Sequence, residues 1–140
     1  MTKTLYTAEA TVVGGRGGHG QTSDRALDVQ LRVPPELGGD GGGTNPEQLF
    51  AAGYGACFHG ALNLLALRHG IASRGSSVDV TVAFGRDPVD GRHSLTAHVV
   101  VRLPGLERTL AERLVRETER ICPYAKMVRQ GIESSVRVET

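Results

Sequence analysis

A stretch without any Asp, Glu, Lys or Arg, residues 49–67, constrains the fold most. Just ahead of it, Asn45 can cap a helix and Pro46 suits the first helical position, so we expect one helix from there to a point near Gly70. A helix that carries no charge on any face needs cover on every side. The sequence therefore predicts a long buried central helix.

This stretch is also long enough to cross a membrane. Small and polar residues interrupt it throughout, namely Gly53, Gly55, His59, Gly60 and Asn63. Because these residues lower its hydropathy, we expect a helix inside a folded core and no membrane partner.

Strand-like alternation appears on both sides of this helix. Residues 5–13 and 26–33 are separated by a glycine-rich segment and predict antiparallel strands joined by a turn. Residues 77–84 and 94–103, with turn residues between them, predict a hairpin. Strands and helices are grouped rather than strictly alternating, which indicates the α+β class with antiparallel sheets.

Two further elements complete the prediction. Residues 106–121 keep one apolar stripe among many charges, and Glu112 and Arg116 have the spacing of a helical ion pair, so we expect an amphipathic helix. Residues 136–138 alternate and predict a short terminal strand. A chain of 140 residues with 39% hydrophobic content suits a single domain over residues 1–140.

Charge and cysteine content limit the partners and the compartment. The formal net charge is +1 with acids and bases interspersed, which gives no reason to expect a nucleic-acid partner. The first residues lack the apolar core of a signal peptide, and two cysteines are too few for a secreted disulfide scaffold. We expect a cytoplasmic protein.

Three cofactor signals are weak. Residues 15–20 fit G-x-G-x-x-G, but the dinucleotide fingerprint needs a helix directly afterwards and the following residues alternate like a strand. The glycine run before Thr44 lacks the lysine of a phosphate-binding loop. Cys57, Cys122, His19 and His59 lack the close pairs of a zinc site. We expect no bound cofactor and no metal.

Cys57 lies in the middle of the uncharged stretch, and Cys122, before a proline, is the only other cysteine. A cysteine there can simply be a small buried apolar residue. A reactive thiol, in contrast, needs a nearby cation to favour the thiolate. Arg16 in the glycine loop could supply that charge, and Glu47 could orient its guanidinium through a bidentate pair.

Helix geometry limits how these groups can meet. Ten residues separate Glu47 from Cys57, which is roughly 15 Å along a continuous helix. Either the helix breaks near Gly53 and Gly55, or Arg16 and Glu47 meet the cysteine of a second subunit. We prefer the dimer, because two uncharged helices could then cover each other.

Residues 44–54 and 56–62, together with residues 122–126, closely resemble the organic hydroperoxide resistance (Ohr) family of the OsmC-like superfamily. The resemblance extends over essentially the whole chain. It implies the OsmC/Ohr-like fold, an intertwined homodimer and thiol peroxidase activity. In this family pattern Cys57 matches the peroxidatic cysteine and Cys122 the resolving one, while Arg16 and Glu47 match the active-site pair.

The resemblance also implies the reaction. Cys57 would reduce an organic hydroperoxide to an alcohol and become a sulfenic acid, and Cys122 would convert it to a disulfide. A dihydrolipoyl group, free or on a lipoylated protein, would act as reductant. His19 and His59 are not required by the pattern.

Substrate preference has a separate basis in the residues. An apolar mouth would favour alkyl or fatty-acid hydroperoxides, and core packing is the competing role of the side chains that could form it. The candidates are Leu49, Phe50, Phe58 and Leu62. Two alternatives stay open: an OsmC-type peroxidase with broader peroxide use, and a non-enzymatic redox-sensing or ligand-binding module.

Overall fold

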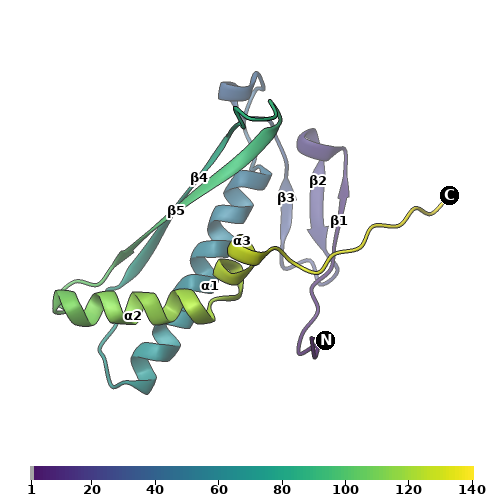
Figure 1. Cartoon of the computed structure of the whole chain (residues 1–140). Coiled ribbons are helices and arrows are strands. Elements are labelled where there is room, and N and C mark those ends of the chain that lie inside the picture. The colour runs from purple at the N-terminus through teal and green to yellow at the C-terminus, as the bar shows by residue number, and fades with distance from the viewer. Residues whose placement is uncertain (1) are drawn as a thin grey trace. The chain divides into compact units, whose positions relative to one another are not determined.

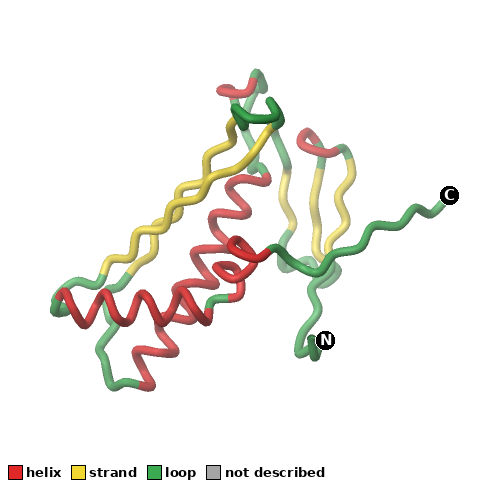
Figure 2. Tube along the Cα trace, viewed as in Figure 1, coloured by secondary structure: helices red, strands yellow, loops and turns green. Residues whose placement is uncertain are grey.

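The computed structural model describes residues 2–140, which form two compact units. The first unit runs as far as Phe50, and the second runs from Ala51 to Thr140. Helix α1 (Pro46–Arg68) contains the boundary between them. The described residues form antiparallel sheets and three α-helices, which confirms the α+β class (Figures 1 and 2).

The first unit contains a three-stranded antiparallel sheet in the order β1-β2-β3. Its strands are β1 (Ala10–Val13), β2 (His19–Thr22) and β3 (Asp28–Gln30). The predicted direct pairing of residues 5–13 with 26–33 is therefore wrong, because β2 lies between the two outer strands. β2 has no apolar residue, so alternation gave no sign of it.

Helix α1 begins and ends where the sequence predicts. The side-chain oxygen of Asn45 accepts a hydrogen bond from the backbone N–H of Gln48 at 2.8 Å, which is an N-cap contact. At the other end, Gly70 adopts a left-handed conformation with φ 65°. The helix is continuous, so the predicted alternative of a break near Gly53 and Gly55 is wrong.

Only one face of α1 is buried in the single chain. Its buried residues recur at helical spacing: Tyr54, Phe58, Leu62, Leu65 and Ala66. The cover on all sides that the sequence predicts is thus not supplied by one chain. Among residues 2–140, α1 is the one helix that is long and apolar enough to cross a membrane, a test that core helices of soluble proteins also pass.

The second unit contains the predicted hairpin and two further helices. Strands β4 (Ser77–Arg86) and β5 (His93–Arg102) pair antiparallel over their full length. Helices α2 (Arg108–Ile121) and α3 (Pro123–Gln130) follow. Figure 1 shows α2 and α3 in the yellow-green part of the chain, with α2 beginning near the end of β5 and α3 following at the other end of α2.

The core of the second unit forms where α1 meets α2. Leu62, Leu65 and Ala66 pack with Leu114, and apolar residues at the end of β5 lie against them. The amphipathic character of α2 is confirmed, since Leu114 is 2% exposed. The predicted ion pair of Glu112 with Arg116 is not the one formed: Glu112 bonds Arg108 Nε at 2.7 Å, one turn earlier.

The C-terminal part differs from the prediction in two ways. Residues 131–140 form no strand, so the terminal strand predicted at residues 136–138 is wrong. Val136 is 95% exposed, and alternation alone supplies no strand to pair with. Helix α3 was not predicted, because Pro123 was interpreted only as the stop of the preceding helix. In the structure, α2 ends just before this proline, and Pro123 is also the first residue of α3.

Candidate active site

The two cysteines lie side by side in the second unit, although 65 residues separate them. Cys57, on α1, is partly exposed, and Cys122, between α2 and α3, is fully buried. Their Sγ atoms are 3.4 Å apart and neither forms a disulfide. A disulfide needs an S–S distance of about 2.05 Å. A small approach of the two sulfurs would therefore join them.

Cys122 is held firmly at its place. Its backbone has φ −66° and ψ 119°, the extended conformation that a following proline favours. Its N–H donates to the carbonyl of Thr118 at 2.9 Å, and the buried Thr118 hydroxyl donates to the carbonyl of Leu114. These contacts tie the buried thiol to the last turn of α2.

The environment of Cys57 has opposing effects on its thiol. Burial raises the pKa of Cys57 most, the backbone N–H of Tyr124 lowers it by a hydrogen bond, and the adjacent Cys122 raises it further. The net direction is upward, whereas the sequence predicts a thiol with a lowered pKa. The single chain therefore does not by itself favour the thiolate.

Tyr124 is a site residue that the sequence analysis missed. It is the second residue of α3, where backbone N–H groups have no partner within the helix and stabilise negative charge. Its ring lies 6.2 Å from that of Tyr54, and a side chain at Gly53 would come within 3.1 Å of the Tyr124 hydroxyl. The Pro123 signal for a helix start could have indicated this N–H.

Arg16 and Glu47 form the predicted bidentate pair in the first unit. Arg16 Nη1 donates to Glu47 Oε2 at 3.0 Å, and Nη2 donates to Oε1 at 2.8 Å. The hydrogen bond from Arg16 lowers the pKa of Glu47, and that same bond raises the pKa of Arg16. The Glu47 side chain is 14% exposed and that of Arg16 is 42% exposed.

The loop that carries Arg16 turns sharply because glycines flank that residue. Arg16 lies in a single 3-10 turn, Gly15–Gly17, and the preceding Gly14 has φ 82°. Glycine adopts such angles without strain. A strand, β2, follows this turn, so the helix that a dinucleotide fingerprint requires is not present there.

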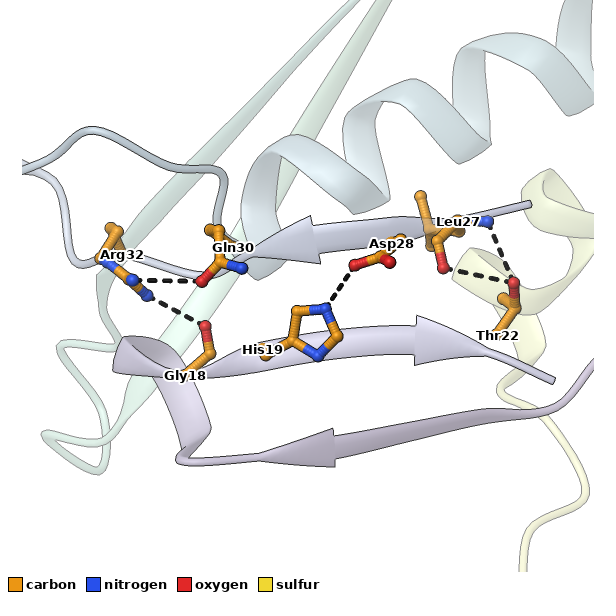
Figure 3. A network of polar contacts seen from close by, with 7 residues as sticks. All are labelled: Gly18, His19, Thr22, Leu27, Asp28, Gln30 and Arg32. Carbon is orange, nitrogen blue, oxygen red and sulfur yellow. Dashed lines mark hydrogen bonds and ion pairs between the residues drawn. The ribbon is translucent and has the colours of Figure 1, made fainter. Parts of the chain in front are cut away.

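Both histidines from the sequence analysis have partners of their own. His19 Nε2 lies against a carboxylate oxygen of Asp28 on the neighbouring strand (Figure 3). His59 Nε2 lies 2.9 Å from the hydroxyl of Ser76. Within residues 2–140, no three His, Cys, Asp or Glu side chains gather as a metal site would require.

The four predicted substrate-binding residues divide into two groups. Phe58 is 3% exposed and Leu62 is fully buried among core residues, which is the competing packing role. Leu49 and Phe50 are partly exposed in the first unit. In the single chain, only the second group has surface to offer a ligand.

Comparisons with known proteins agree on one family. The model of the family described as "OsmC-like protein" matches residues 39–137. An organic hydroperoxide resistance protein of Xanthomonas axonopodis pv. citri is 44% identical over 133 residues, which cover 94% of this chain and 92% of that protein.

Solved structures give the same answer. A crystal structure of an organic hydroperoxide resistance protein OsmC from Legionella pneumophila aligns with a TM-score of 0.85 and 41% identity, covering 92% of this chain and 93% of that one. The OhrB protein of Bacillus subtilis aligns with a TM-score of 0.81 and 40% identity, covering 91% and 93%. The chain therefore belongs to the OsmC-like family and, within it, to the organic hydroperoxide resistance proteins.

Proposed function

We propose that this protein is a thiol-dependent peroxidase that reduces organic hydroperoxides to alcohols, with Cys57 as the attacking thiolate and Cys122 as the resolving thiol. The observation that carries the proposal is the 3.4 Å separation of two free sulfurs, one partly exposed and one buried. A thiol open to a peroxide beside a protected second thiol is the arrangement that disulfide formation needs. The names of the relatives support the substrate class.

In the first step the Cys57 thiolate attacks one oxygen of the peroxide O–O bond. The O–O bond breaks with its electron pair on the other oxygen, which takes a proton and leaves as the alcohol. Sulfur is oxidised to a sulfenic acid and the peroxide is reduced. The N–H of Tyr124 supports this step, because a hydrogen bond to the sulfur favours the thiolate.

In the second step the Cys122 sulfur attacks the sulfenic sulfur of Cys57. An S–S bond forms, the S–O bond breaks, and hydroxide takes the Cys122 proton and leaves as water. This removes Cys57 from further oxidation to sulfinic acid. A dithiol then reduces the disulfide to two thiols and itself becomes a disulfide.

The dithiol of this proposal is a dihydrolipoyl group, free or on a lipoylated protein. The family resemblance is what supports this choice. A thiol couple that cycles in this way works in a reducing compartment, so the proposal places the reaction in the cytoplasm.

Arg16 and Glu47 complete the site in this proposal. Burial raises the pKa of Cys57, so catalysis needs a cation to favour its thiolate and to polarise the peroxide. Arg16, oriented by Glu47, is the group proposed. Because α1 is unbroken between Glu47 and Cys57, we propose that the pair of one subunit serves the cysteine of a second subunit.

The exposed apolar surface of α1 supports a homodimer. In the most apolar part of this helix only 28% of residues are buried. Leu67 is 79% exposed and Leu64 is 44% exposed, although both belong to an uncharged stretch. Contiguous apolar surface of this kind marks an interface. A second copy would supply the missing cover.

Steady-state turnover tests the proposal. We expect the wild type to consume cumene hydroperoxide with dihydrolipoamide faster than with thioredoxin, and faster than it consumes hydrogen peroxide. Cys57→Ser should abolish turnover. Cys122→Ser should prevent formation of the disulfide, so the dithiol cannot regenerate Cys57 by reducing it. Equal use of hydrogen peroxide would favour an OsmC-type enzyme instead, and one stoichiometric oxidation without turnover would indicate a redox sensor.

A further inference from the structure

The Arg16 loop has little backbone structure of its own. Glycines precede and follow Arg16 on both sides, and Gly14 and Gly15 are left-handed. The two hydrogen bonds inside the turn are long, with Gly17 N 3.2 Å from Gly14 O and Gly18 N 3.3 Å from Gly15 O. Glycine-rich segments lose much conformational freedom when they are ordered. The loop therefore needs an external contact to keep one conformation.

The ion pair with Glu47 is a weak candidate for that contact. The Arg16 side chain is 42% exposed, and solvent screens exposed ion pairs so that they stabilise a fold only slightly. An ion pair also requires its two side chains to be placed beforehand. Something else must bring the loop to Glu47.

The backbone N–H of Leu31 donates to the Gly18 carbonyl at 2.9 Å, but the contact that also includes Gly17 is made by Arg32. Its Nη1 donates to the carbonyls of Gly17 and Gly18, at 3.0 Å each, and to the carbonyl of Leu31 at 2.6 Å. Its Nη2 donates to Gln30 Oε1 at 3.1 Å, and Figure 3 shows the side chain reaching from the end of β3 towards the Gly18 end of the loop. Among residues 2–140, no carboxylate pairs with Arg32. The positively charged guanidinium of Arg32 therefore donates hydrogen bonds to neutral acceptors, and two of these are carbonyl oxygens of the loop.

The backbone of Arg32 reaches the other half of the ion pair. Its N–H donates to the Thr44 carbonyl at 2.9 Å, and the Thr44 N–H donates to the Gln30 carbonyl at 2.9 Å. Thr44 directly precedes the cap of α1 and lies three residues before Glu47. One residue thus connects the loop that carries Arg16 to the segment that carries Glu47.

We propose that Arg32 is the positioning residue of the Arg16–Glu47 pair: its guanidinium holds the glycine loop by two carbonyls in the conformation in which Arg16 meets Glu47. The catalytic consequence rests on the proposed function, whereas the loop contact does not. Lysine can replace it only in part, because a single ammonium can approach the loop carbonyls but cannot also bond Gln30 Oε1, as the second nitrogen Nη2 of the guanidinium does.

Limited trypsin digestion tests the loop contact without any activity. Trypsin cleaves after Arg16, and the cleavage rate follows local opening of the loop. We expect Arg32→Met to speed this cleavage about tenfold relative to cleavage after Arg25, with a smaller effect in Arg32→Lys. Arg86→Met is the matched control, because Arg86 also donates to a turn carbonyl, that of Gly91. It should leave the ratio unchanged.

The ratio of the two cleavage rates separates local from global effects. If Arg32→Met unfolds the first unit, trypsin cleaves faster after both Arg16 and Arg25. The ratio measured in Arg32→Lys then decides whether Arg32 holds the loop. A wild-type ratio in both Arg32 variants would overturn the proposal.

A double-mutant cycle tests the catalytic consequence. We expect Arg32→Met to lower kcat/KM for cumene hydroperoxide about tenfold in the wild type and to have no further effect in Arg16→Met. Equal factors in both backgrounds would show that Arg32 does not act through Arg16. If the wild type has no peroxidase activity, the proposed function fails, and the trypsin ratio still decides the role of Arg32.

Discussion

At the residue scale, the Arg16–Glu47 pair makes stability depend on pH in one direction. Arg16 lowers the pKa of Glu47 below its ordinary value of 4.5 in the folded chain. The stabilisation is therefore present above pH 4.5 and is lost as the pH falls through the lower folded value.

We expect Glu47→Gln to reduce the free energy of unfolding by about 0.5 to 1 kcal/mol at neutral pH. The difference from the wild type should disappear in acid. Urea unfolding across the pH range measures it, with Glu36→Gln, an exposed acid of the same unit, as control. A Glu47→Gln effect that is the same at every pH would contradict the account.

At the scale of elements, α1 is anchored by one buried face against α2. Leu62 is fully buried in that contact. We expect Leu62→Ala to reduce the free energy of unfolding by about 3 kcal/mol, because a cavity remains in the core. Val89→Ala, in the hairpin turn where Val89 is 92% exposed, should change it by less than about 0.5 kcal/mol. If chemical denaturation gives similar values for both, Leu62 is not a core residue.

The same elements show what sequence reasoning can reach. The cap at Asn45 and the alternation of β4 and β5 are local signals, and both predicted the structure correctly. β2 was missed because its residues carry no apolar periodicity, and its partners on both sides are what make it a strand. The strand predicted at residues 136–138 failed for the opposite reason, since its alternation meets no partner strand among residues 2–140.

The candidate site also contains contacts that the sequence predicted and one that it did not. The residue types suggested that Arg16 pairs with Glu47, and the resemblance suggested that Cys57 pairs with Cys122; both contacts are present. The Tyr124 contact is made by a backbone N–H, which every residue type except proline possesses, so the identity of Tyr124 could not reveal it and only the helix-start signal of Pro123 could have indicated it.

At the scale of the whole molecule, the proposed dimer makes a prediction by complementation. Arg16→Met chains should keep only a small residual activity, and Cys57→Ser chains should have none. Co-expressed, they should recover about a quarter of wild-type activity, because random pairing makes about half of the dimers mixed and each mixed dimer has one intact site out of two. As a control, purified homodimers of the two variants are mixed under conditions in which subunits do not exchange, and no activity should be recovered. No recovery in mixed dimers would mean that one chain supplies the whole site.

The most direct test of the central claim is a single oxidation followed by intact-mass and peptide-mass analysis. Reduced protein is treated with one equivalent of cumene hydroperoxide in the absence of a reductant. The account predicts a Cys57–Cys122 disulfide in the wild type, a trapped sulfenic acid on Cys57 in Cys122→Ser, and no oxidation of Cys122 in Cys57→Ser. Oxidation of Cys122 in Cys57→Ser, or a wild type that forms no disulfide, would contradict it.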